Sequence, residues 1–274
     1  MARVQSPAPW IAAAAAPPRN DDRRPPAAKG RQRPRERLRF GRIPVVQAPP
    51  LSRSISLVIF DCDGVLIDSE VISARVLVEE AARDGVALTP AYVRDHFLGR
   101  SFPTVAAIIR ERFATALPAD FEHRYRSRLL ARFETDLRLT PGILELIARL
   151  RVPFCLATSS SPPRLARSLA ITGLDRVFAH RFTASEVARG KPAPDLFLHA
   201  AARMGAMPGR CLVIEDSRPG VLAAQAAGMR VGLYAGASHM RGAGLPPDPA
   251  VPAFDDWAAF PGLWPDTITE EPRP

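Results

Sequence analysis

Short apolar runs rich in β-branched residues recur along this chain, and helical patterns separate them. The clearest runs cover residues 56–60, 154–157 and 211–214, a weaker one covers 231–234, and a short one is expected within 178–183. Continuous apolar runs of this length are typical of strands that are buried on both faces. Their alternation with helical segments predicts an α/β fold built on a doubly wound, Rossmann-like parallel sheet.

The alternation is interrupted between residues 71 and 139, where only helical patterns occur. The helices expected there cover 71–83, 105–113 and 121–133, and a further one begins at Thr89-Pro90. Threonine suits the N-cap of a helix, and proline suits its first turn. We therefore expect an inserted all-helical domain at 71–139, within an α/β core made of residues 55–70 and 140–244. The Pro-rich C-terminal segment 245–274 is expected to pack only through 254–263.

The basic excess of the chain is confined to its first fifth. The formal net charge is +9, and residues 1–54 hold twelve basic and three acidic side chains, so residues 55–274 hold 25 of each kind. The same first segment contains ten prolines and little periodicity, which predicts a disordered basic tail. The charge balance of the remaining chain argues against a nucleic-acid partner, except through that tail.

The cysteines, the histidines and the length of the apolar runs narrow the protein class further. Cys62, Cys155 and Cys211 are far apart and form no zinc-binding spacing, which predicts buried free thiols in a reducing, cytoplasmic compartment. No apolar run reaches the roughly 18 residues that span a bilayer, so we expect no membrane partner. The histidines at positions 96, 123, 180, 199 and 239 are scattered and are expected to be surface or packing residues. For the oligomeric state of the chain, we expect a monomer.

Polar side chains follow three of the predicted strands at the point where each strand ends. They are Asp61, Asp63, Thr158, Ser159, Glu215 and Asp216. Because ligands of parallel sheets bind beyond the carboxyl ends of the strands, we expect these side chains to meet. Two carboxylates at positions i and i+2 need a cation or a shared proton between them. Lys191 is the only lysine after residue 29, and an ammonium group reaches phosphate as a slender point charge.

Carboxylates, hydroxyls and one ammonium group together suit phosphoryl transfer assisted by Mg²⁺. One carboxylate can act as a nucleophile, and a second can protonate the leaving oxygen. The sequence therefore predicts an enzyme with a small phosphorylated metabolite as its substrate and Mg²⁺ as its cofactor.

Four motifs in this order resemble those of the haloacid dehalogenase-like hydrolase superfamily. They are Asp61-x-Asp63-Gly64-Val65-Leu66, Thr158 after an apolar strand, Gly190-Lys191-Pro192-Ala193-Pro194-Asp195, and Glu215-Asp216-Ser217-x-x-Gly220. The likeness spans about residues 55–240. Within the superfamily the chain looks most like the helical-cap sugar-phosphate phosphatases, 6-phosphogluconate phosphatase among them, and the related β-phosphoglucomutases.

The resemblance implies a role for each matching residue. Asp61 would be the nucleophile and Asp63 the general acid and base. Thr158, Ser159 and Lys191 would hold the phosphoryl group. Mg²⁺ would be held by Asp61, the Asp63 carbonyl and Asp216, with Glu215 either on the metal or bracing Lys191. The inserted helices would form a cap that closes over the site, and Ser69, Glu70 and Arg100 would contact the substrate.

Two alternatives remain beside hydrolysis of a small sugar, sugar-acid or polyol phosphate. A sugar phosphomutase would carry a cap histidine and a cap arginine where this chain has Ser73 and Phe102, so hydrolysis is favoured. A non-catalytic regulatory protein that binds nucleic acid through its basic tail would not need the intact acidic motifs.

Overall fold

The computed structural model describes residues 54–113, 117–241 and 250–269. Its core is a six-stranded, all-parallel sheet with strand order β3-β2-β1-β4-β5-β6. The strands are β1 (Leu57–Phe60), β2 (Phe154–Thr158), β3 (Arg181–Thr183), β4 (Cys211–Glu215), β5 (Arg230–Tyr234) and β6 (Ala253–Phe254). The predicted doubly wound α/β sheet is confirmed, since the chain extends the sheet first to one side of β1 and then to the other.

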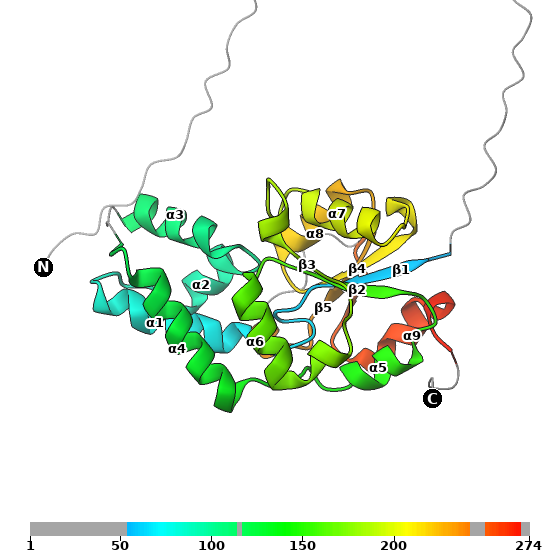
Figure 1. Ribbon diagram of the computed structural model, residues 1–274, viewed down its shortest axis with the longest axis horizontal. Coiled ribbons are helices and arrows are strands. Elements are labelled where there is room, and N and C mark those ends of the chain that lie inside the picture. Colours follow the sequence, from blue (N-terminus) through cyan, green and yellow to red (C-terminus); the bar gives the residue numbers. More distant parts are fainter. Residues whose placement is uncertain (1–53, 114–116, 242–249, 270–274) are drawn as a thin grey trace, which may run out of the picture. The chain divides into compact units, whose positions relative to one another are not determined.

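Helices cover both faces of the sheet (Figure 1). They are α5 (Ile143–Arg149), α6 (Pro162–Thr172), α7 (Asp195–Arg203), α8 (Arg218–Ala226) and α9 (Phe260–Leu263). The side chains of β1 alternate between the two faces, as a strand requires. Leu57 and Ile59 join the apolar cluster of α7 and α8, whereas Val58 and Phe60 join that of α5, α6 and α9. The wholly apolar sequence of β1 follows from burial on both sides.

Of the five helices that the described residues form between β1 and β2, the first four make up the inserted cap. They are α1 (Glu70–Arg83), α2 (Pro90–Phe97), α3 (Phe102–Phe113) and α4 (Phe121–Asp136). The predicted start of α2 is confirmed, because the Thr89 side chain accepts a hydrogen bond of 3.1 Å from the Tyr92 backbone N–H. Helices α1 and α4 pack together, and the buried Glu80 carboxylate of α1 is ion-paired with Arg124 and Arg128 of α4.

The C-terminal segment contributes an edge strand and two tryptophans to the core. Strand β6 was not predicted, because two residues carry no periodicity. Trp257 stacks on Tyr234 of β5 with ring centroids 4.3 Å apart, and its indole N–H donates to the Thr140 hydroxyl at 3.1 Å. Packing was expected only through 254–263, but it extends further on both sides, because Val251, Trp264 and Thr267 are buried as well.

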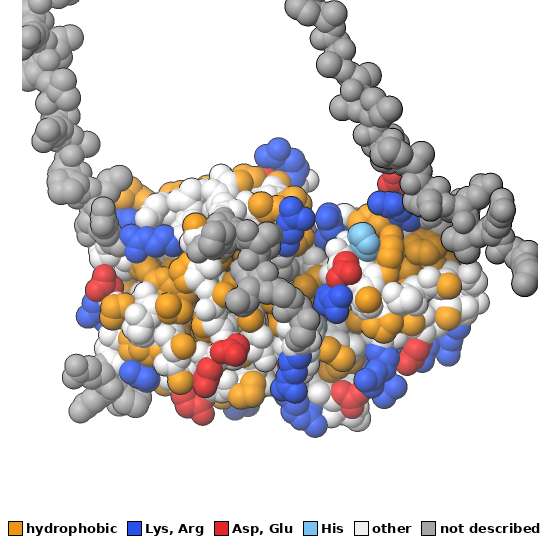
Figure 2. Space-filling view, turned by 180° about the vertical axis from the view of Figure 1, so that it is seen from behind, with side chains coloured by type: hydrophobic (Ala, Val, Ile, Leu, Met, Phe, Trp, Pro, Cys, Tyr) orange, Lys and Arg blue, Asp and Glu red, His pale blue; other side chains and the backbone are white. Residues whose placement is uncertain are grey.

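Short 3₁₀ helices complete the described chain. They are η1 (Leu174–Arg176), η2 (Ala184–Glu186), η3 (Pro208–Arg210), η4 (Ser238–Met240), η5 (Trp257–Ala259) and η6 (Pro265–Thr267). The predicted tail 1–54 lies, apart from Ser54, outside the described residues. In the part that the structure describes, no helix has the length and apolar character that crossing a membrane requires. Figure 2 shows acidic and basic side chains interspersed over one face, in keeping with the neutral charge balance of residues 55–274.

Candidate active site

The predicted polar side chains meet where the sheet changes its direction of winding. Strand β1 has β2 on one side and β4 on the other, so the sheet extends from β1 in both directions. A crevice at such a point is where open parallel sheets bind ligands. Asp61 follows β1, Thr158 ends β2, and Glu215 ends β4. The structure thus brings together residues that lie more than 150 positions apart.

Lys191 places a buried ammonium group between two carboxylates. Its Nζ donates to Asp61 Oδ1 and to Glu215 Oε1, each at 2.6 Å, and its side chain is only 1% exposed. Burial opposes the charge of Lys191, but Asp61 and Glu215 outweigh it and raise its pKa. Burial raises the pKa of Asp61 well above its ordinary value, although Lys191 acts in the opposite sense. The ion pair fixes one oxygen of Asp61 in place.

Glu215 has both carboxylate oxygens engaged. Oε1 accepts from Lys191, and Oε2 accepts from the backbone N–H groups of Asp216 and Ser217, each at 3.0 Å, and from the Ser217 hydroxyl at 2.9 Å. Gly220 explains the spacing of this motif, because a Cβ there would overlap the Glu215 carboxylate. Of the two expected alternatives, this geometry supports a brace for Lys191.

Three buried carboxylates form a candidate cation site. Asp61, Glu215 and Asp216 each place one oxygen within 4.8 Å of the others. Burial, and next the charge of Glu215, raise the pKa of Asp216, and its Oδ2 atom has no hydrogen-bond partner. Gly64, at φ +76°, leaves room for this carboxylate, because a Cβ there would overlap Asp216 Oδ2. The orphaned oxygen and the all-oxygen donor set fit a hard divalent cation.

Asp63 is held by three donors that keep it ionised. Ser69 and Arg164 donate to its Oδ1 at 2.6 Å each, and Ser160 donates to Oδ2. Burial opposes ionisation, yet the Arg164 guanidinium and the serine hydroxyls hold the pKa of Asp63 below its ordinary value. Ser69 is fully buried beneath Asp63 and does not line the cavity, so its expected contact with substrate is not supported.

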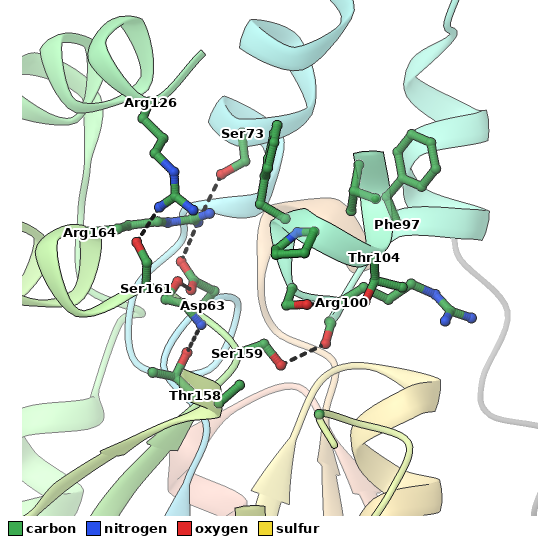
Figure 3. Close-up of a pocket in the computed structure, with 18 of the residues that line it drawn as sticks. Asp63, Ser73, Phe97, Arg100, Thr104, Arg126, Thr158, Ser159, Ser161 and Arg164 are labelled. Atoms are coloured by element: carbon green, nitrogen blue, oxygen red, sulfur yellow. Dashed lines mark hydrogen bonds and ion pairs between the residues drawn. The ribbon is translucent and has the colours of Figure 1, made fainter. Parts of the chain in front are cut away.

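Arg164 links the α/β core to the cap and was not predicted. Figure 3 shows it on α6 between Asp63 and Ser73 of α1, whose hydroxyl it reaches at 3.1 Å. Its guanidinium also lies over the Phe133 ring of α4, 5.5 Å from the centroid. A cation in the first turn of a helix opposes the helix dipole, so a basic residue just after Pro162-Pro163 was a usable signal of an anionic partner.

The cap closes the site through further contacts with the loop after β2. The Ser159 hydroxyl donates to the Gly99 carbonyl at 3.0 Å, and Arg126 of α4 donates to Ser161 (Figure 3). The Thr158 hydroxyl accepts from the Ser160 backbone N–H at 3.0 Å. In this closed arrangement, the hydroxyls expected to hold phosphate are therefore engaged with the protein itself.

A cavity of about 730 Å³ lies between the cap and the core. Asp61, Asp63, Thr158, Glu70 and Arg100 are among its lining residues, so the last two occupy the wall where substrate contact was expected. Burial, followed by the charge of Asp63, raises the pKa of Glu70 to about 7. The cavity is large enough for a small metabolite.

His239 is buried, which lies within the surface or packing roles expected of the histidines, but its position against the acidic cluster was not expected. Its side chain is 5% exposed, and its Nε2 lies 3.0 Å from Asp216 Oδ2. The sequence offered no pattern around this residue, since η4, the loop after β5, reaches Asp216 only in the folded chain.

Comparison with known proteins agrees with this geometry. A family model described as haloacid dehalogenase-like hydrolase matches residues 55–228. The 6-phosphogluconate phosphatase of Escherichia coli (strain K12) is 28% identical over 212 residues, covering 77% of this chain and 95% of that protein. A probable pseudouridine-5'-phosphatase of Drosophila melanogaster is 35% identical over 194 residues, covering 65% and 81%.

A solved structure extends the likeness to the fold. The crystal structure of a conserved haloacid dehalogenase-like protein of unknown function from Agrobacterium tumefaciens matches with a TM-score of 0.64 and 33% sequence identity, covering 77% of this chain and 97% of that one. The resemblance inferred from the four motifs is confirmed, and this chain belongs to the haloacid dehalogenase-like hydrolases.

Proposed function

We propose that this enzyme is a Mg²⁺-dependent phosphatase that hydrolyses a small phosphomonoester, such as a sugar, sugar-acid or polyol phosphate. The observation that carries the proposal is the meeting of two buried aspartates, each held by its own cationic side chain. Asp61 is locked to the Lys191 ammonium, and Asp63 is held by Arg164 and two hydroxyls. Both carboxylates line one cavity between the cap and the core. Two carboxylates at one cavity can supply the nucleophile and the proton donor of one reaction.

In the first step, an oxygen of Asp61 attacks phosphorus. A bond forms between Asp61 and phosphorus, and the ester bond to the alcohol breaks. Asp63 must carry a proton for this step and gives it to the departing alcohol oxygen, whereas the ionised form that its three donors favour is the form used in the second step. In the second step, ionised Asp63 takes a proton from a water that attacks the aspartyl phosphate, which releases inorganic phosphate and restores Asp61. Lys191 stabilises the charge that develops on the transferred oxygens.

The carboxylates of Asp61 and Asp216, with the Asp63 carbonyl, would hold Mg²⁺. When bound, the ion supplies charge neutralisation for the phosphoryl group and for the acidic cluster. The single Lys191 charge does not balance Asp61, Glu215 and Asp216 together, which supports a cation at this position. Glu215 braces Lys191, because its four hydrogen bonds leave it committed to protein groups.

The cap, expected at residues 71–139, excludes water and sets the substrate. Arg100, Arg126 and His123 line the cavity on its cap side and suit a polar, oxygen-rich leaving group. The relatives named as phosphatases of 6-phosphogluconate and hexitol phosphates support the same class. Ser73, at the place of the mutases' cap histidine, is engaged with Arg164 and the Ser69 carbonyl, which supports hydrolysis over the mutase alternative.

The proposal is tested by release of inorganic phosphate from a panel of sugar, sugar-acid, polyol and glycolate phosphates, with Mg²⁺ and with EDTA. We expect turnover of at least one member with Mg²⁺, and none by the Asp61→Asn variant, whose unfolding midpoint stays close to that of the wild type. Asp175→Asn, an exposed change on η1, is the matched control and should retain full activity. Hydrolysis above background by Asp61→Asn in Mg²⁺ would contradict the assignment.

A further inference from the structure

His239 presents an unexplained buried imidazole beside the acidic cluster. Its Nε2 lies 3.0 Å from Asp216 Oδ2, and the side chain is 5% exposed. Neither ring nitrogen has an aligned hydrogen-bond partner, and the facing oxygen of Asp216 lacks one too. Buried polar atoms without partners are costly and rare, so two of them face to face indicate a missing component between or beside them.

The imidazole is placed here by contacts from distant parts of the chain. Asp68, in the loop after β1, accepts from the Ser238 backbone N–H at 3.1 Å and from the Ser238 hydroxyl, which fixes η4 against that loop. Gly64 provides the space, because a Cβ there would press on both His239 and Asp216. The position of His239 is thus built into the first motif.

The imidazole ring can donate a hydrogen bond to Asp216. A neutral imidazole carries one N–H and can direct it at a carboxylate oxygen. His239 contacts Asp216 and is not a member of the cluster of Asp61, Glu215 and Asp216, so it approaches that cluster from outside.

We propose that His239 is a positioning residue for the cation site, whose Nε2–H is donated to Asp216 Oδ2 when the ion is bound. Holding one oxygen of Asp216 stops the carboxylate from rotating and directs the group at the ion. Partners that orient metal ligands in this way contribute about 10- to 100-fold in metal affinity. The inference rests on the proposed function only in placing a divalent cation on Asp216.

The test measures Mn²⁺ binding to the full chain without substrate, from the loss of the free-ion signal in electron paramagnetic resonance. His239→Leu keeps the volume and removes the donor, and we expect its dissociation constant to rise about 10- to 100-fold. Gln places an amide N–H near the Nε2 position, so His239→Gln should remain within about threefold of the wild type, whereas the shorter Asn should bind as weakly as Leu. His199→Leu, at a histidine of α7 that pairs with Glu186, is the matched control and should bind normally.

Thermal unfolding in EDTA separates positioning from packing, because the metal-free variants should melt close to the wild type. If His239→Leu does not fold, the pair His239→Gln and His239→Asn makes the same comparison. The inference is overturned if wild type and His239→Leu bind Mn²⁺ equally, if Gln loses as much affinity as Leu, or if the wild type binds no Mn²⁺. Mn²⁺ binding with the expected pattern, but without hydrolysis of any phosphomonoester, would overturn the proposed function and leave this inference standing.

Discussion

The Lys191 ion-pair system makes the sharpest test of the site, because it can be measured as stability without any substrate. Lys191→Met removes the ammonium group but keeps a chain of similar length. The change leaves the carboxylates of Asp61 and Glu215, each 2.6 Å from the lost Nζ, without their cation. Both carboxylates are at least 94% buried, so water cannot replace the lost charge.

The expected cost is about 3–5 kcal/mol in the free energy of unfolding at pH 7, since breaking a buried ion pair leaves an uncompensated charge. This is a large part of the roughly 5–15 kcal/mol that holds an ordinary domain folded. The double variant Lys191→Met/Glu215→Gln removes one of the two stranded charges. We therefore expect it to recover part of the loss, which a packing defect caused by the methionine side chain alone would not allow.

The stability of Lys191→Met should depend on pH in a direction that follows from the stranded carboxylates. Without the ammonium group, the stranded carboxylates bind protons in the folded protein at a pH where they are ionised in the unfolded chain. The variant's stability therefore rises as pH falls from 8 to 5, and its deficit against the wild type shrinks. Urea unfolding followed by circular dichroism at several pH values measures this. A deficit below about 1 kcal/mol at pH 7, or one that grows on acidification, would refute the reasoning.

Three further predictions use single changes. Arg164→Gln should raise the pKa of Asp63, so the limb of the pH profile of kcat/KM that reports Asp63 should move up by about one unit; Arg126→Gln, which removes a cavity arginine without contact to Asp63, should leave that limb in place. The pKa of Glu70 is raised from 4.5 to about 7, so the wild type should lose up to about 3 kcal/mol of stability as pH rises through this window. Glu70→Gln should abolish this dependence of stability on pH. An equal dependence in the variant and the wild type would contradict the prediction. Thr89→Ala removes the N-cap of α2 and should cost about 1 kcal/mol in chemical denaturation, whereas an unchanged midpoint would show that the cap is not needed.

Much of the fold was predictable because its signals are local. The apolar runs that become β1, β2, β4 and β5 are buried on both faces, and such burial selects continuous apolar sequence. The start of α2 at Thr89-Pro90 depends only on its own backbone and side chain. Strand β6 could not be predicted, because Ala253–Phe254 pairs with β5 through backbone groups that any short segment provides.

The site likewise contains residues that the sequence predicted and residues that it did not. The motifs around Asp61, Lys191 and Glu215 could be recognised because a spacing and a residue type carry the chemistry. For Arg164 the sequence signalled an anionic partner but did not identify it as Asp63, which lies 101 positions away. His239 could not be assigned a role, because Asp216 lies 23 positions away on another element and no pattern links the two. Ser69 was expected at the substrate, but the turn of the loop after β1 directs it beneath Asp63.

The sequence by itself determined that this chain would form a parallel sheet with an inserted helical cap, and which strand ends would carry acidic groups. The alternation of strands and helices and the spacing of motif residues are properties of the local chain, so they can be recognised in the sequence alone. Only the tertiary structure decided which charges neutralise one another. It placed Lys191 between two carboxylates, Arg164 across Asp63, and His239 against Asp216, because the electrostatic energy of a buried group depends on distances that only the folded packing sets.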